Sequence, residues 1–344
     1  MYDYKSFILE KIKHINTSIF FNESFTNINN YLNDVDQNNI FYLVDNKVFE
    51  LHKKLFQPNK NTLLIKSTED SKSIKNISSL IEKILKLGGN KKSYIIGIGG
   101  GIVCDITGFI ASIFMRGIRF AYVPTTVLSI TDAALGGKNG VNFNNIKNLV
   151  GTINEPNFVL VDLCFLDSLK ENEFNDGFAE IIKHACIASP KLFKKLEKSL
   201  ISYKSRDLLS EILKESISVK LNIVSKDIND LTLRKILNFG HTLGHAIEAK
   251  YKFSHGNSVS LGMIYACQIS NKLGYLSDKK VNRVKNLLNK FGLPIDVSKI
   301  NVSEILHLIE KDKKAKYYNI DFIILRDIGC AEILNIKISD LIHE

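Results

Sequence analysis

The sequence lacks the features that mark secreted and membrane proteins. No apolar run approaches the roughly 20 residues that cross a bilayer, and the segment Met1–Phe21 alternates charged and apolar residues. That alternation lacks the uninterrupted apolar core of a signal peptide. We therefore expect a cytoplasmic protein that has no membrane partner.

Cysteine and arginine are also scarce. The five cysteines are widely spaced and form no CxxC pair, which favours reduced thiols over disulfides or a cysteine metal site. Only six of the 46 basic residues are arginines, and the lysines are spread along the chain. Nucleic-acid surfaces favour clustered basic residues with arginine forks. The net charge of +10 therefore predicts a solvated lysine-rich surface, part of which serves an anionic substrate.

The 344 residues suffice for two domains, and the pattern changes along the chain. Short apolar strands first alternate with amphipathic helices, which predicts a Rossmann-like α/β nucleotide-binding domain with a parallel sheet covered on both faces. From about Glu171 onward helical periodicities prevail, which predicts a mainly α-helical domain. We place the boundary near residues 155–165, between domains 1–160 and 161–344. The predicted strands are 40–44, 63–65, 93–98, 120–123 and 320–325, and the predicted helical segments are 71–87, 102–114, 191–213, 261–273 and 281–291.

Ten of the twenty glycines lie between Gly97 and Gly151. The first group, 97–105, follows a predicted strand and opens a helix, whose free backbone N–H groups suit a pyrophosphate. It does not match GxGxxG, because Ile102 and Cys104 stand where a third glycine belongs. A tight strand–helix turn without a ligand therefore stays open.

The second glycine group extends from Pro124 to Asn148 and includes two lysines and several amides. Lysine ammonium groups and asparagine amides are good donors to phosphate and carboxylate oxygens. The Gly-Gly-Lys sequence at 136–138 follows the apolar segment 133–135, which favours a lined pocket over a polar surface loop.

Three of the eight histidines lie within fifteen residues. His241 and His245 are four apart, so a helix places them on one face, and His255 follows ten residues later. Upstream, the segment Glu180–Lys183 sets an acid and a lysine on one helical face. Three histidines and a glutamate offer the ligands of a catalytic zinc site, but spacing alone does not decide which of them bind. Thr242 stands where a zinc metalloprotease needs glutamate, so that class is disfavoured.

Together and in this order, these segments resemble the 3-dehydroquinate synthases, members of the sugar-phosphate cyclases. The resemblance spans about residues 40–330. No single segment is decisive, but the ordered set is specific. The matching segments are GGGIVCDITGF, MRG, PTT, GGKNGVN with the KN that follows, GFAEIIK, LRKILNFGHTLGHAIEA, HGNSVSLGM and DKK at 312–314.

The resemblance implies a role for each matching polar position. The implied metal ligands are Glu180, His241 and His255. The implied NAD contacts are Asp45, Gly99, Gly100, Gly101, Asp105, Thr125, Thr126, Lys138 and Lys147. The implied substrate contacts are Lys138, Asn148, Asn238 and His245 for the phosphate, Arg234 for the carboxylate, and Asp132, Lys183 and Lys220 for the ring hydroxyls. In a homodimer Arg116 is expected to reach the partner's site, and either Lys313 or Lys314 to approach the phosphate.

The implied activity is that of a carbon–oxygen lyase in the shikimate pathway of aromatic amino acid biosynthesis. It converts 3-deoxy-D-arabino-heptulosonate 7-phosphate into 3-dehydroquinate and phosphate. The implied cofactors are NAD, reduced and reoxidised within each turnover, and zinc or cobalt. Between the two redox steps phosphate is eliminated, and an intramolecular aldol step closes the ring.

Three alternatives remain. A sister cyclase for a neutral sugar phosphate would leave Arg234 without a carboxylate to bind. A metal-dependent alcohol dehydrogenase of related fold would accumulate NADH. A non-catalytic nucleotide-binding module would bind no metal.

Four positions depart from the usual pattern of the family. Ala133 and Ala134 replace a common serine pair, Asn257 replaces the glutamate of HGE, and Thr232 stands where glycine often precedes Leu-Arg. None is among the implied contacts, so we expect these departures to affect fine tuning only.

Overall fold

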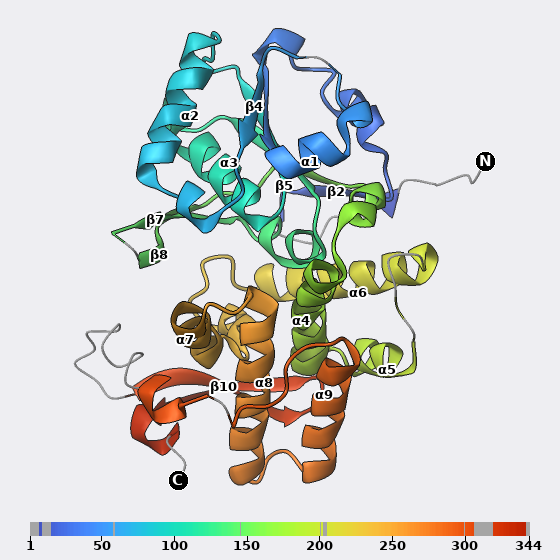
Figure 1. Cartoon of the computed structure of the whole chain (residues 1–344), viewed down its shortest axis with the longest axis vertical. Coiled ribbons are helices and arrows are strands. Elements are labelled where there is room, and N and C mark those ends of the chain that lie inside the picture. The colour runs from blue at the N-terminus through green and yellow to red at the C-terminus, as the bar shows by residue number, and fades with distance from the viewer. Residues whose placement is uncertain are drawn as a thin grey trace. The chain divides into compact units, whose positions relative to one another are not determined.

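The computed structural model describes residues 7–8, 15–57, 59–144, 146–199, 201, 205–298, 300–305 and 319–341 (Figure 1). The chain forms two compact units, Met1–Leu169 (unit 1) and Lys170–Glu344 (unit 2). The segment 312–314, which carries the expectation for Lys313 and Lys314, lies outside the described residues.

Unit 1 contains a seven-stranded sheet in the order β1-β2-β9-β6-β5-β3-β4. All neighbouring strands are parallel except β1 and β2. The strands are β1 (Phe7–Ile8), β2 (Ser18–Phe21), β3 (Ile40–Asp45), β4 (Thr62–Ile65), β5 (Tyr94–Gly99), β6 (Arg119–Pro124) and β9 (Phe158–Val161). The helices are α1 (Asn46–Leu51), α2 (Ile74–Lys86) and α3 (Gly101–Ile113). The four predicted strands of the first half are therefore confirmed, whereas β1, β2 and β9 were not predicted.

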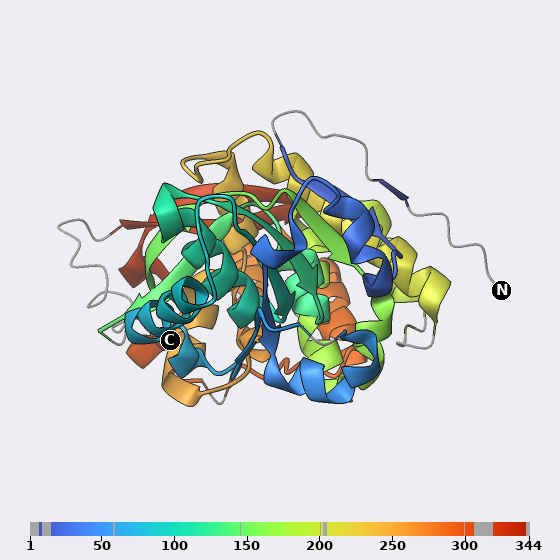
Figure 2. The same ribbon diagram turned by 90° about the horizontal axis from the view of Figure 1, so that it is seen from above.

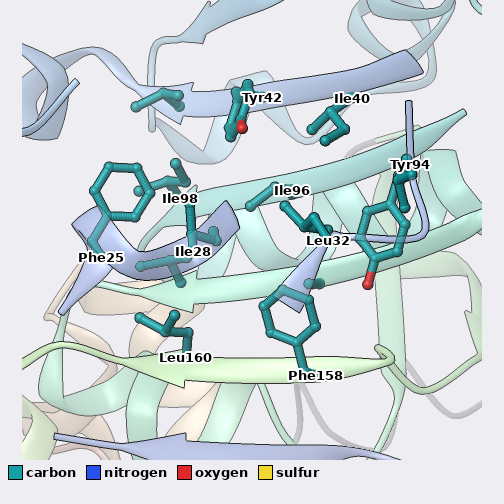
Figure 3. Packing of buried hydrophobic residues seen from close by; sticks show 14 of the residues in the cluster. Phe25, Ile28, Leu32, Ile40, Tyr42, Tyr94, Ile96, Ile98, Phe158 and Leu160 are labelled. Atoms are coloured by element: carbon teal, nitrogen blue, oxygen red, sulfur yellow. The ribbon is translucent and has the colours of Figure 1, made fainter. Parts of the chain in front are cut away.

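Both faces of this sheet are buried. Side chains that alternate along the central strands form one cluster with the short helix η1 (Phe25–Tyr31), as Figure 3 shows. Tyr42, Ile96 and Leu160 lie in that cluster. On the other face α3 packs so closely that a Cβ on Gly97 would lie 2.4 Å from Thr107 Oγ1. On β3, β5, β6 and β9 nearly every residue is buried, which explains why these strands are apolar runs rather than alternating ones.

Unit 1 extends nine residues beyond the predicted end of the first domain, from 160 to Leu169. The short helix η7 (Leu163–Ser168) packs back onto the unit 1 core, where the Phe25 and Phe165 rings lie 5.8 Å apart. The N–H of Phe25 also donates to Asp162 at 2.8 Å. Contacts distant in sequence therefore set this boundary.

An antiparallel ribbon, β7 (Lys138–Phe143) and β8 (Ile146–Ile153), projects from unit 1 (Figures 1 and 2). Its base is anchored to α3, since Thr152 and Asn154 both hydrogen-bond the Ser112 hydroxyl. Most of β8 is exposed. The ribbon was predicted only as a glycine-rich loop, because its strands lack the apolar alternation of a buried strand.

Unit 2 is mainly helical, as predicted. Two antiparallel strands, β10 and β11, accompany its helices, and β10 confirms the predicted late strand. Within the described residues, every helix is too short or too polar to cross a membrane. The elements are α4 (Glu171–Ala188), α5 (Pro190–Lys198), α6 (Arg206–Val224), η8 (Leu233–Asn238), α7 (His241–Tyr251), α8 (His255–Lys272), α9 (Asp278–Lys290), β10 (Asn319–Asp327), β11 (Cys330–Lys337) and η9 (Ile338–Leu341).

The continuous helical segment predicted for 191–213 is wrong, because α5 ends at Lys198 and α6 begins at Arg206. The Lys290 ammonium of α9 donates to the carbonyls of Leu196, Glu197 and Ser199 at 2.7–2.9 Å. A cation at these carbonyls stabilises a helix end. The break could not be recognised from the sequence, because apolar residues recur at helical spacing on both sides of it.

Candidate functional site

The turn between β5 and α3 consists of Gly99, Gly100 and Gly101. A Cβ on Gly99 would lie 3.2 Å from Asp45 Cβ, and one on Gly100 would lie 3.4 Å from Thr126 Cγ2. The turn therefore brings together residues at the carboxyl ends of three parallel strands. Because Gly100 caps α3 without a side chain, the first N–H groups of the helix are left for a ligand.

The neighbouring polar positions are held mainly by backbone contacts. Asp45 ends β3 and accepts the Lys47 N–H at 2.8 Å. Thr125 is buried, and its N–H donates to Gly99 O at 3.0 Å. This edge, at the carboxyl ends of parallel strands, is where open α/β sheets bind ligands.

Lys72 is a polar residue of unit 1 that the sequence analysis missed. Its ammonium donates to Asp105 Oδ2 and to Asn148 Oδ1, both at 2.5 Å, and the side chain is only 6% exposed. It thereby links α3 to the β7–β8 ribbon. The sequence feature that could have revealed Lys72 is its position between β4 and α2. The loop there lies at the carboxyl edge of the sheet, where ligands bind.

Burial raises the pKa of Asp105, although Lys72 opposes that effect, and the negative charges of Glu69 and Asp132 add to it. Asp132 lies in the π-helical turn Ser129–Ala133. The Asp105 carboxylate, close to two others, therefore depends strongly on the Lys72 ammonium.

The remaining predicted contacts of unit 1 are exposed. Lys138 begins β7 and Lys147 lies on β8, both at the surface. Arg116 is also exposed and lies in a tight turn, where Met115 (φ 49°) and Arg116 (φ 61°) both adopt left-handed backbone conformations. Such a conformation is uncommon for residues other than glycine. The backbone at Arg116 is therefore strained.

In unit 2 the three predicted metal ligands come together from three helices. Glu180 is fully buried on α4, His241 begins α7, and His255 begins α8. Glu180 Oε1 lies 3.4 Å from His241 Nε2 and 3.3 Å from His255 Nε2. The ligand atoms of these three residues lie within 4.8 Å of one another.

The hydrogen bonds of both imidazoles favour metal binding. His241 Nδ1 lies 3.2 Å from the carbonyl oxygen of Phe239, and His255 Nδ1 lies 3.3 Å from Glu248 Oε2. Both partners are acceptors, so each Nδ1 carries the proton that it donates. Each Nε2 is then the ligand atom, and both Nε2 atoms point toward Glu180.

This geometry fits a divalent ion. Two ligands that each lie about 2.1 Å from a tetrahedral ion are about 3.4 Å apart, close to the two distances from Glu180 Oε1. Two imidazoles and one carboxylate leave a fourth position open, as catalytic zinc sites do.

Neighbouring charges and hydrogen bonds shift the pKa values of Glu180 and its two histidine partners. Burial disfavours the Glu180 carboxylate, but Lys183 and then His241 outweigh it and hold the pKa of Glu180 well below its usual range. Burial likewise disfavours charged His255, but its hydrogen bonds to Glu180 and Glu248 raise the pKa of His255 to about 10. Burial and the charge of Lys183 lower the pKa of His241.

Unit 2 also buries three cationic side chains at predicted positions. Lys183 on α4 pairs with Glu180, Lys220 lies on α6, and Arg234 lies in η8. The Arg234 guanidinium donates to Ile228 O at 2.7 Å. Three buried cations in one unit make this region positively charged, which favours an anionic ligand.

The other two predicted positions of unit 2 are exposed. Asn238 ends η8, and His245 lies one turn along α7 from His241 with their ring centroids 5.1 Å apart. The predicted common face of the two histidines is therefore confirmed. His245 does not belong to the three-residue group that could hold a metal.

Two positions that depart from the family pattern lie in defined contacts. Thr232 donates its N–H to Asp227 at 2.6 Å, and the same carboxylate accepts the N–H groups of Leu231 and Arg234. Although desolvation opposes them, these hydrogen bonds lower the pKa of Asp227 to about 2. Ala133 lies beside Gly101. A Cβ added to that glycine would lie 3.2 Å from the alanine methyl group.

The comparisons with protein families and relatives agree with one another. A family model described as 3-dehydroquinate synthase N-terminal matches residues 62–176, and one described as 3-dehydroquinate synthase C-terminal matches residues 177–315. The 3-dehydroquinate synthase of Dictyoglomus turgidum is 40% identical over 300 residues, covering 85% of this chain and 84% of that protein.

Two solved structures share the fold. The 2-epi-5-epi-valiolone synthase from Streptomyces hygroscopicus, with NAD+ and Zn2+ bound, has a TM-score of 0.83 at 20% identity, covering 97% of this chain and 96% of that one. A 2-deoxy-scyllo-inosose synthase complexed with carbaglucose-6-phosphate, NAD+ and Co2+ has a TM-score of 0.81 at 24% identity, covering 94% and 95%. At these identities the likeness shows the fold alone.

Proposed function

Since the chain belongs to the 3-dehydroquinate synthase family, we propose that it converts 3-deoxy-D-arabino-heptulosonate 7-phosphate into 3-dehydroquinate and phosphate. The observation that carries the proposal is the convergence of one carboxylate and two imidazoles in a unit that also buries three cationic side chains. A metal site of this kind near buried cations suits a substrate that bears both a carboxylate and a phosphate.

Glu180, His241 and His255 are proposed to hold zinc or cobalt. The ion, when bound, supplies a Lewis acid for negative charge that develops on a substrate oxygen. The chain itself positions the three ligands, because hydrogen bonds at the Nδ1 atoms fix both imidazole rings. Lys183 holds the Glu180 carboxylate in its charged form.

NAD is proposed to bind the carboxyl edge of the unit 1 sheet, where it supplies a hydride acceptor and donor that is regenerated in each turnover. The glycine turn leaves the N-terminus of α3 open for the pyrophosphate. The Asp45 carboxylate at the end of β3 suits a ribose hydroxyl. The other proposed NAD contacts are Asp105, Thr125, Thr126, Lys138 and Lys147.

The proposed substrate contacts follow the charge of each side chain. The buried Arg234 guanidinium suits a carboxylate, because its planar fork can donate two parallel hydrogen bonds. In unit 1, Lys138 and Asn148 offer donors to phosphate oxygens. In unit 2, Asn238 and His245 do the same. The groups proposed for the ring hydroxyls are Asp132, Lys183 and Lys220.

The test of this function is phosphate release with NAD present at roughly one hundredth of the substrate concentration. We expect release to continue far beyond the NAD equivalents while NADH stays near zero. NADH that accumulates with product would favour an alcohol dehydrogenase. Turnover only with a sugar phosphate that lacks the carboxylate would favour a sister cyclase. No bound metal and no turnover would favour a nucleotide-binding module.

We further propose that the protein acts in the cytoplasm as a homodimer in which Arg116 reaches the partner's site. The exposed arginine held by a strained turn supports this role, since a guanidinium binds phosphate in two places. In a mixed dimer of Arg116→Ala and Lys138→Ala chains, one site combines an intact Lys138 with a donated Arg116. We expect about half of the wild-type activity per mixed dimer. A mixed dimer as inactive as both parents would exclude action across the interface.

A further inference from the structure

Glu248 is a charged residue of α7 that the proposed function has not used. It lies seven residues after His241 and three after His245, so the helix carries all three on one face. Glu248 Oε2 lies 3.3 Å from His255 Nδ1, and the glutamate side chain is 19% exposed. It contacts a proposed metal ligand without belonging to the group that could hold the metal.

The two nitrogen atoms of His255 face different carboxylates. Nδ1 faces Glu248 and Nε2 faces Glu180, both at 3.3 Å. Because a carboxylate only accepts, Glu248 keeps the proton on Nδ1. A metal ion that replaces the proton at Nε2 leaves the bond to Glu248 intact. Glu248 therefore determines both the tautomer and the plane of this ring.

The backbone of His255 is held by other residues. Ser254 caps α8 by accepting the Asn257 N–H, and Asp176 accepts both the Ser254 hydroxyl and the Asn257 N–H. This contact also explains how the helix start tolerates Asn257, because the capping hydrogen bond comes from its backbone N–H. The start of α8 thus depends on Asp176, whereas the His255 ring depends on Glu248.

We propose that Glu248 is a positioning residue that holds His255 for the metal ion and raises the ligand strength of its Nε2. His241 has only a neutral carbonyl at the equivalent Nδ1 atom, so the two histidines are not equivalent ligands. A charged acceptor donates more electron density through the ring than a neutral one does, and outer carboxylates of this kind typically change metal affinity 10- to 100-fold. The inference rests on the metal centre of the proposed function.

The test is the metal affinity of the metal-free full-length chain, measured without substrate by competition between the protein and a chelator for Zn2+. We expect Glu248→Ala to bind about 100-fold more weakly and Glu248→Gln about 10-fold more weakly, because glutamine keeps an acceptor but loses the charge. The matched control is Glu304→Gln. Glu304 is exposed and pairs with Lys250, which lies on α7 as Glu248 does. Its substitution should leave the Zn2+ affinity within about twofold of the wild type.

A double-mutant cycle separates positioning from general damage. In a His255→Ala background, Glu248→Gln should cause less than about a twofold further loss, because the ring through which it acts is gone. Equal losses in both backgrounds would overturn the proposal, as would a Glu248→Gln affinity within about twofold of the wild type.

The outcome distinguishes this inference from the function on which it rests. If the wild-type chain binds no divalent metal, the proposed metal centre fails and the inference fails with it. If the wild type binds metal and the Glu248 variants match it, only the role of Glu248 is excluded. A Co2+ absorption spectrum provides a second reading, because it should change in band position in Glu248→Gln while keeping the intensity of the same coordination number.

Discussion

Unit 1 and unit 2 present their proposed ligand contacts with different parts of the chain. In unit 1 the contacts centre on a glycine turn, backbone N–H groups and exposed side chains of a protruding ribbon. In unit 2 they are polar and ionisable side chains, most of them buried, on α4, α6, η8, α7 and α8. The proposed site of unit 1 depends on the space that the backbone leaves open. The proposed site of unit 2 depends on charges that compensate one another.

This difference predicts different sensitivities. A backbone site tolerates changes of side-chain chemistry but not an added Cβ where the chain is tightly packed. A buried charge site is sensitive to the loss of any one member, because the remaining charges lose their partners. Glu180 illustrates this, since Lys183, His241 and His255 all contact its carboxylate.

The largest effect is expected at His241 of unit 2. His241→Ala removes one of three proposed ligands and should weaken metal binding by more than about 100-fold, beyond the effect of an outer-shell group. His245→Ala should keep the metal and lose rate, because His245 lies outside the three-residue group. Metal analysis of both purified variants provides the measurement. Equal metal loss from both would show that the ligand assignment is wrong.

An intermediate effect is expected at Lys72, whose buried ion pair in unit 1 resembles those of unit 2. Lys72→Met removes the cation that contacts Asp105 and should lower the free energy of unfolding by about 2–3 kcal/mol at neutral pH. Because burial already raises the pKa of Asp105, the variant's carboxyl group protonates as the pH falls. The loss should therefore shrink between about pH 7.5 and pH 5.

Denaturant unfolding at both pH values measures this loss, with Lys75→Met as the control. Lys75 is an exposed lysine of α2, so its substitution should change stability by less than about 0.5 kcal/mol. A Lys72→Met loss that is unchanged by pH would mean that Asp105 does not respond to the missing cation.

The sequence predicted features that depend on neighbours along the chain. The glycine turn after β5, the shared face of His241 and His245, and the pair of Glu180 with Lys183 all follow from short spacings. The family resemblance then supplied the grouping of residues from different helices, which spacing alone left open.

The features that were missed depend on residues far apart in the chain. Lys72 meets partners 33 and 76 residues away. Strand β9 is an exception, because its run Phe158–Val161 has the same apolar pattern as the predicted strands and was overlooked. The end of α5 is held by a lysine of α9, more than ninety residues later. No local pattern encodes these contacts, because each exists only after the chain has folded.

The smallest effect is expected within the glycine turn and tests the backbone half of the comparison. A Cβ on Gly99 would lie 2.6 Å from Val103 Cγ2, too close for van der Waals contact, whereas one on Gly100 would lie 3.4 Å from Thr126 Cγ2, an ordinary contact. Gly100 has φ −76°, which alanine adopts readily. Gly99→Ala should therefore lower the free energy of unfolding by about 1–2 kcal/mol, and Gly100→Ala should change it by less than about 0.5 kcal/mol. Denaturant unfolding of the NAD-free protein provides the measurement, since it excludes any effect on cofactor binding. If the two variants lose equal stability, tight packing against α3 does not explain the glycine at 99, and unit 1 would be less dependent on its backbone than this comparison requires.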